Sequence, residues 1–341
     1  MSESAATGLD LRGAGKRIAF FAVVLVAIVV GVSTLPGVGE VRDRLSSADP
    51  WWLVGAAACA IASRLGYVRA LWAAFDRVIR WRRMLVLGMA EQGANVLLPA
   101  GGAGGPALGA YVLRRLGVPG DLAVERHVAL FLVTSTVSFV ALVAAGLAVG
   151  TGVLPGDASP MWTLVPAGVA AAVIALAVLY ARRPPPADPH GGRVRQTVWR
   201  VRRYVHDGAA TTLHLLRHGD PLFVGGAFSN FAFDVASLGC AFQAFGGGAP
   251  PVGEFVVAYA LGHAGALIPT PGGVGGTEGG LIGMFVVFGT PLSLAAAAVL
   301  AYRVFQLGFP AIFGAAALVR VRHVLAHPPS AELVAAQFRR D

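Results

Sequence analysis

Long apolar runs separated by short polar segments dominate the chain. Six runs approach or exceed membrane-spanning length, at 18–35, 51–75, 122–150, 161–181, 222–245 and 291–319. A helix needs about 20 mostly apolar residues to cross a bilayer. Two further apolar blocks, 84–113 and 254–289, are interrupted by glycines and prolines. The pattern predicts an all-α integral membrane protein with about six full transmembrane helices, in one membrane domain over 18–320.

The composition supports this prediction and excludes several classes of function. Hydrophobic residues make up 56% of the 341 residues and charged residues only 13%, whereas soluble domains carry about 25% charged residues. The net charge of +9 does not indicate nucleic-acid binding, because the basic residues lie in short runs beside apolar blocks. The sequence has no P-loop and no HExxH motif. We therefore expect no cofactor, no metal site and no catalytic residue.

The distribution of arginines predicts the topology. Basic residues at 77–83, at 114–115 and in the loop 182–221 should be cytoplasmic, as should the terminal segments 1–17 and 321–341. The block 84–113 has basic residues at both ends, and the block 254–289 has none at either end. We therefore predict that both blocks are re-entrant hairpins and that they enter the membrane from opposite sides.

The two interrupted blocks also share a motif. The segment "LLPAGGAGGPALGAYVLRRLGVP" (97–119) corresponds to "LIPTPGGVGGTEGGLIGMFVVFGTP" (267–291), with a proline lead, a GGxGG core and a final Gly-x-Pro. Inverted repeats of this kind place broken helices and a binding site near the bilayer midplane. Irregular backbone is tolerated at that depth only where it is buried in protein or lines a polar cavity. The alternative is that the glycines only let helices pack closely.

Charged and amide side chains inside apolar blocks are the candidate site residues. Glu278 follows the second glycine core, and Arg303 lies about twelve residues into the last helix, so we expect these two to be coupled. The alternative is a buried ion pair that only fixes packing. The other polar candidates for a midplane cavity are Arg64, Arg69, Glu91, Asn95, Asn230 and Asp234.

The basic loop contains one amphipathic segment. In "RVRQTVWRVRRYV", helical spacing places Val194, Val198, Val201 and Val205 on one face, with arginines over much of the rest. This pattern is typical of a helix that lies on an anionic leaflet. A solvated basic linker is the alternative.

Three segments, "NVLLPAGGAGG", "PTPGGVGGTEGG" and "AYRVFQLGFP", resemble the membrane region of bacterial lysylphosphatidylglycerol synthases over about 18–320. In those synthases this region is regarded as a phospholipid flippase, and a separate soluble domain transfers the amino acid. The resemblance implies roles for Pro271, Gly272, Gly273, Gly275, Glu278 and Arg303, and for Pro99, Gly101, Gly102, Gly104 and Gly105. At position 106 the resemblance leads us to expect a polar residue, and this sequence has proline there instead. Only a short basic tail follows Val319, so we expect no aminoacyltransferase domain.

The leading hypothesis is a flippase that moves an anionic phospholipid or a lipid-linked head group across a bacterial cytoplasmic membrane. A separate lipid synthase or glycosyltransferase is the expected partner, and a homodimer is compatible with the sequence. One alternative is a membrane enzyme acting on a lipid-linked substrate, with Glu278 or Asp234 as acid/base. A small-solute secondary transporter is another, because inverted repeats serve both classes.

Overall fold

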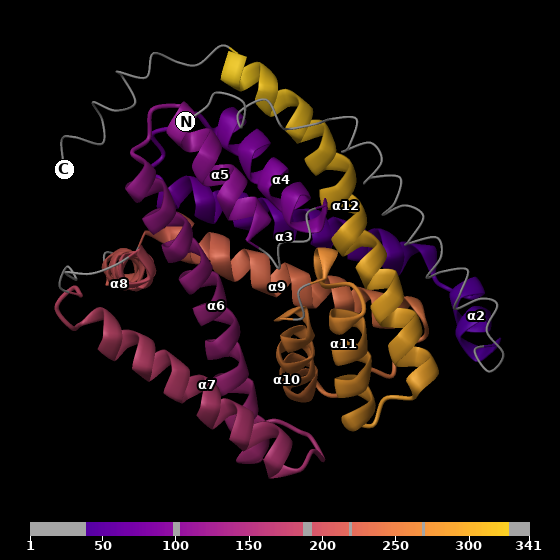
Figure 1. Ribbon diagram of the computed structural model, residues 1–341. Helices are drawn as coiled ribbons and strands as arrows, with labels where there is room; N and C mark the ends of the chain where they lie inside the picture. Colours follow the sequence, from indigo (N-terminus) through magenta and orange to yellow (C-terminus); the bar gives the residue numbers. More distant parts are fainter. Residues whose placement is uncertain (1–38, 98–102, 187–192, 218–219, 268–269, 327–341) are drawn as a thin grey trace.

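The computed structural model describes residues 39–97, 103–186, 193–217, 220–267 and 270–326, and its regular elements there are all helical (Figure 1). Five helices are long and apolar enough to cross a membrane: α3 (Pro50–Ala74), α6 (Gly120–Gly150), α7 (Pro160–Ala181), α9 (Pro221–Ala244) and α12 (Leu292–Ala326). The prediction of a multi-pass helical membrane protein is confirmed. The expected first span, 18–35, lies outside the described residues.

Shorter helices complete the described fold. They are α2 (Gly39–Ser46), α4 (Trp81–Leu97), α5 (Gly104–Arg115), α8 (Arg193–Arg217), α10 (Val252–Gly262) and α11 (Gly276–Val287). Two short 3-10 helices, η2 (His263–Leu267) and η3 (Pro271–Gly273), lie between α10 and α11.

Local sequence signals begin three of the long helices. Each starts with proline after a side chain that caps the helix, in the pairs Asp49-Pro50, Ser159-Pro160 and Asp220-Pro221. The Asp49 carboxylate accepts a hydrogen bond from the backbone N–H of Trp51 at 2.9 Å. Proline suits the first helical turn because the N–H it lacks would have no partner within the helix, and the capping oxygen satisfies one of the remaining donors.

Glycines set the closest helix crossings. The helix α3 packs along α9, and α4 packs along α12. A Cβ atom on Gly66 would lie 2.6 Å from the backbone nitrogen of Asn230, and one on Gly93 would lie 2.6 Å from Cα of Gly314. Small residues at such positions let helix backbones approach within a membrane. These glycines lie outside the two GGxGG motifs, so the crossings leave the close-packing alternative for the motif glycines untested.

The interrupted blocks form two helical hairpins. The helix α4 packs on α5, and α10 packs on α11. These helices have 17, 12, 11 and 12 residues, fewer than the roughly 20 needed to span a bilayer. In Figure 1, α4 and α5 lie in the upper half, α10 and α11 lie in the lower half, and α12 runs past both hairpins.

The second hairpin reaches the first at its tip. The turn η3 contacts α4, and a Cβ atom on Gly272 would lie 3.8 Å from Cγ1 of Val96, near the end of α4. The glycine reversal of the second hairpin thus lies against the end of α4. That both hairpins are re-entrant, and the side from which each one enters the membrane, stay predictions.

Single-cysteine labelling tests that topology. With Cys59 and Cys240 replaced, a cysteine at the exposed position Leu292 should react with a membrane-impermeant maleimide added outside intact cells. Cysteines at Arg82 and Arg115, which are also exposed, should react only after the membrane is opened. Labelling of positions 292 and 115 from the same side would contradict the arrangement of opposed hairpins.

Candidate functional site

A buried carboxylate on α9, Asp234, joins four helices. Its Oδ1 accepts a hydrogen bond from Nη2 of Arg64 on α3 at 2.9 Å. Its Oδ2 accepts from the hydroxyls of Tyr259 on α10 at 2.5 Å and of Tyr302 on α12 at 2.7 Å, and from Nε2 of Gln306 at 3.0 Å. A charge inside an apolar bundle persists only when it is paired and hydrogen-bonded. Asp234 meets that condition through both oxygens.

A second ion pair secures the tip of the second hairpin. Arg303 donates from Nε to Oε1 of Glu278 at 2.7 Å, from Nη2 to the carbonyl of Gly272 at 2.7 Å, and from Nη1 to Oε1 of Gln306. The other oxygen of Glu278 accepts from the backbone N–H of Gly275 at 2.7 Å. The predicted coupling of Glu278 with Arg303 is therefore a direct contact between α11 and α12.

Gln306 connects the two pairs into one network. Its amide nitrogen donates to Asp234, and its amide oxygen accepts from Arg303. Two arginines and two carboxylates alternate along the network, so its formal charge is zero. The ends are the more accessible members, with Arg64 and Glu278 side chains 18% and 12% exposed, against 8% for Asp234 and 5% for Arg303.

Glycine is required by the backbone at the second tip. Gly272, Gly273 and Gly275 have φ angles of +62°, +67° and +87°, which side-chain-bearing residues rarely adopt. This reversal sets Glu278 in the first turn of α11, where the unpaired N–H groups and the positive end of the helix dipole favour a carboxylate.

The first hairpin carries a separate polar cluster around Glu91, which is fully buried on α4. Its Oε2 accepts from the hydroxyl of Tyr67 at 2.9 Å, and its Oε1 lies 3.1 Å from Nε2 of His127 on α6. The other ring nitrogen of His127 lies 2.7 Å from the carbonyl of Ala123, which can only accept, so Nδ1 carries a proton. Glu91 thus receives a hydrogen bond from Tyr67 and lies within hydrogen-bond distance of the imidazole of His127.

Gly109 on α5 makes room for this pair. A Cβ atom there would overlap Oε1 of Glu91 and lie 2.6 Å from Nε2 of His127. We expect Gly109→Ala to lower stability by at least about 1–3 kcal/mol, the usual cost of overpacking a core, measured as a lower unfolding temperature in detergent. Gly168→Ala in α7 is the matched control, because no atom lies within 4 Å of its added Cβ. An equal, small effect of both substitutions would contradict this prediction.

The start of α5 is held by Asn95 and borders an apolar groove. Oδ1 of Asn95 accepts from the backbone N–H of Gly105 at 2.7 Å and caps the helix. Beside it, α5 and α6 enclose a groove of about 380 Å³. Apart from the ring of His127, the residues that line this groove are apolar, and they include Pro106 on α5 and Phe131 on α6.

The structure brings some of the predicted site residues together and separates others. Arg64, Asp234, Glu278 and Arg303 share one network with the carbonyl of Gly272 and the N–H of Gly275. Asn230 lies one turn before Asp234 and donates to the carbonyl of Ser63 on α3 at 3.0 Å. The remaining candidates lie elsewhere: Glu91, Asn95, Gly104 and Gly105 in the first hairpin, Arg69 exposed on α3, and Pro99, Gly101 and Gly102 outside the described residues.

Sequence reasoning missed the hydroxyl and imidazole partners. Tyr259 and Tyr302 bind Asp234, and Tyr67 and His127 bind Glu91. A signal was available, because a tyrosine inside an apolar span needs an acceptor for its hydroxyl. Within the described ranges, no group of three His, Cys, Asp or Glu side chains could hold a metal ion.

Comparison with known proteins agrees with this architecture. A family model described as "Lysylphosphatidylglycerol synthase TM region" matches residues 18–314. The match covers both glycine motifs and every charged residue of the network. No curated protein matches the sequence. The family and the five apolar helices indicate a multi-pass membrane protein with a lipid-related function. The chain belongs to the lysylphosphatidylglycerol synthase transmembrane-region family.

Proposed function

We propose that the protein is a lipid translocator that moves the head group of an anionic phospholipid or lipid-linked compound across the membrane past the tip of the second hairpin, where it meets α4. The main support is the network of alternating charges from Arg64 to Glu278, placed where the second glycine reversal approaches α4. A charge-neutral network lets a polar head group meet both arginines and carboxylates at membrane depth, while the acyl chains stay in the lipid.

Arg64 is the best-placed residue to receive a lipid phosphate. Guanidinium groups bind phosphate through paired hydrogen bonds. Arg64 is the most exposed charge of the network, and its buried Nε has no hydrogen-bond partner among the described residues. If Arg64 turned towards a phosphate, Asp234 would keep two tyrosine hydroxyls and the Gln306 amide as donors. If Arg64 exchanges the Asp234 carboxylate for a lipid phosphate, Arg64 and Asp234 therefore both keep hydrogen-bond partners.

Arg303 couples the network to the hairpin. Its bonds to Glu278 and to the carbonyl of Gly272 are polar contacts between α12 and the glycine reversal. A head group that competes for Arg303 would loosen the tip of the second hairpin. We propose that this loosening opens the path between the hairpins, and that the apolar groove between α5 and α6 accommodates part of an acyl chain.

A liposome assay tests the proposal. Purified protein should move a fluorescent anionic phospholipid between leaflets without ATP, since the chain has no nucleotide-binding motif. We expect Gly275→Leu to slow transfer at least severalfold, because the position is exposed at the tip and an added Cβ would meet no atom within 4 Å. The new side chain would therefore project into the proposed path.

Gly289→Leu is the matched control for backbone strain. Gly289 is also exposed, has φ +83° against +87° at Gly275, and lies at the far end of α11. Equal slowing by both substitutions would contradict the proposed path. Consumption of a lipid-linked substrate without lipid transfer would replace the translocator with the membrane enzyme. Transport of a small solute without lipid transfer would favour the secondary transporter.

A further inference from the structure

The amphipathic helix α8 links two membrane-spanning helices on one side of the protein. It begins twelve residues after α7 ends at Ala181 and finishes four residues before α9 starts at Pro221. In Figure 1, α8 is seen end-on at the left, whereas α6, α7, α9 and α12 run along the plane of view. The helix therefore lies across the spanning helices, beside the end of α7 and the start of α9, as a helix along a membrane surface does.

The second half of α8 is docked on α6. Gly208 packs so closely that an added Cβ would overlap Val128, while Ala209, Thr212 and Leu215 are buried. The hydroxyl of Thr211 donates to the carboxylate of Glu125. This half of the helix has a fixed position on the bundle.

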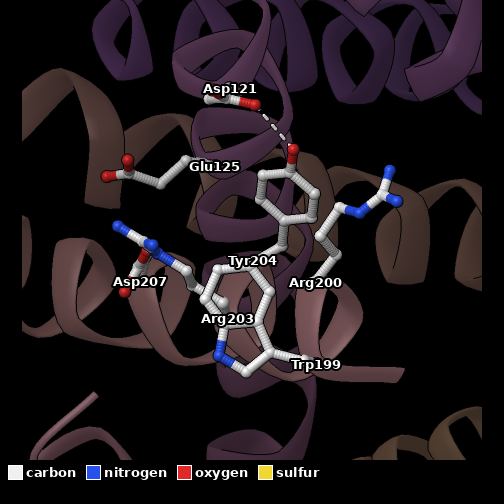
Figure 2. A pocket seen from close by; sticks show the side chains of 7 residues that line it. All are labelled: Asp121, Glu125, Trp199, Arg200, Arg203, Tyr204 and Asp207. Carbon is white, nitrogen blue, oxygen red and sulfur yellow. Dashed lines mark hydrogen bonds and ion pairs between the residues drawn. The ribbon is translucent and has the colours of Figure 1, made fainter. Parts of the chain in front are cut away.

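Polar contacts hold the middle of α8 as well. Figure 2 shows Tyr204 pointing at Asp121, to which its hydroxyl donates at 2.6 Å, beside a pocket of about 340 Å³. This hydrogen bond raises the pKa of Tyr204 above its usual value, so the phenol remains a donor at neutral pH. His206 donates from Nε2 to the carbonyl of Arg183 at 2.7 Å. These bonds set the rotation of α8 about its own axis.

In the first half of α8, the helix face that carries the buried Gly208, Ala209 and Thr212 continues as an apolar stripe that is exposed in the described structure. Val198, Val201 and Val205 are 54%, 57% and 41% exposed, and their spacing of three and four residues places them on one face of the helix. Residues 195–205 contain four arginines and no acidic residue. Of these, Arg195, Arg200 and Arg202 are exposed, and Arg203 lies 3.5 Å from Asp207.

We propose that residues 195–205 of α8 bind the anionic lipid of the membrane leaflet that surrounds them. The valines would enter the boundary between head groups and acyl chains, and the arginines would contact lipid phosphates. The occupant is lipid because α8 joins the ends of two spanning helices, which puts its exposed face at the level of the head groups. A solvated linker would need no apolar stripe, and because this stripe continues the face by which α8 docks on α6, it faces the same side as the spanning helices. This proposal does not depend on lipid translocation.

Depth-dependent quenching tests this surface on the full chain in liposomes. With Cys59 and Cys240 replaced, a bimane label is attached to Val201→Cys or, as the control, to Gln196→Cys, which is exposed on the polar side of the helix. The vesicles contain brominated phosphatidylcholine, with or without phosphatidylglycerol. We expect severalfold stronger quenching at position 201 than at position 196 in the phosphatidylglycerol vesicles. The difference should shrink without phosphatidylglycerol, and also in the variant with R195Q, R200Q and R202Q.

Three results would overturn the proposal. Equal quenching at positions 201 and 196 would show that the valine face does not enter lipid. If quenching at position 201 did not change with phosphatidylglycerol or with the arginine substitutions, the surface would not recognise anionic lipid. Disulfide formation between cysteines at position 201 of two chains, without quenching, would make a second copy of the protein the occupant.

Discussion

Replacing Arg303 with leucine should destabilise the protein by about 3–5 kcal/mol, the usual cost of leaving one partner of a buried ion pair unpaired, and should abolish lipid transfer. The substitution leaves the Glu278 carboxylate without its ion-pair partner and removes the donors to the Gly272 carbonyl and the Gln306 amide. The tip of the second hairpin then loses the ion pair and the hydrogen bonds that join it to Arg303 on α12. Thermal unfolding in detergent and the liposome transfer assay measure the two effects.

A double variant separates stability from function at this pair. Glu278→Gln together with Arg303→Gln removes both charges and keeps groups that can hydrogen-bond across α11 and α12. We expect it to recover most of the stability lost in Arg303→Leu, because no unpaired charge remains buried, and to stay inactive. Full transfer activity in the double variant would make the pair a packing element and contradict its proposed role.

The second large effect is expected at Asp234, whose replacement should cost more stability than replacement of its partner Arg64. Asp234→Ala should cost about 3–5 kcal/mol because it leaves Arg64 unpaired at membrane depth and removes the acceptor of two tyrosine hydroxyls. Arg64→Leu should cost much less, because Asp234 keeps three neutral donors and Arg64 is partly exposed. Unfolding temperatures of the two single variants measure this difference.

Arg64→Leu is also the sharper test of function. If Arg64 receives the lipid phosphate, this variant should remain folded and yet lose most lipid transfer, with Arg64→Lys recovering only part of it because lysine cannot form paired bonds to phosphate. Arg69→Leu, an exposed arginine on the same helix, is the matched control and should keep its activity. Normal transfer by Arg64→Leu would remove Arg64 from the proposed path.

The sequence by itself determined the class of the protein and most of its helices. Apolar runs and helix-start signals depend only on neighbouring residues. The five spanning helices of the structure follow the apolar runs, and three of them also start at the pairs Asp-Pro or Ser-Pro. The interruptions by glycine and proline located both hairpins for the same reason. The valine spacing in the basic loop likewise indicated α8, because an amphipathic helix is a local pattern.

Only the tertiary structure decided which charges meet. Three acids and three bases among the candidate site residues allow many pairings, and helical spacing shows which face a side chain shares but not the residue opposite it. Arg64 pairs with Asp234 across 170 residues because glycines at positions 66 and 226 bring α3 and α9 into close contact. Glu91 instead pairs with His127, in a separate cluster for which Gly109 leaves space. Helix crossings and the absence of a Cβ atom at those glycines, neither of which local sequence specifies, divided the polar residues between two separate clusters.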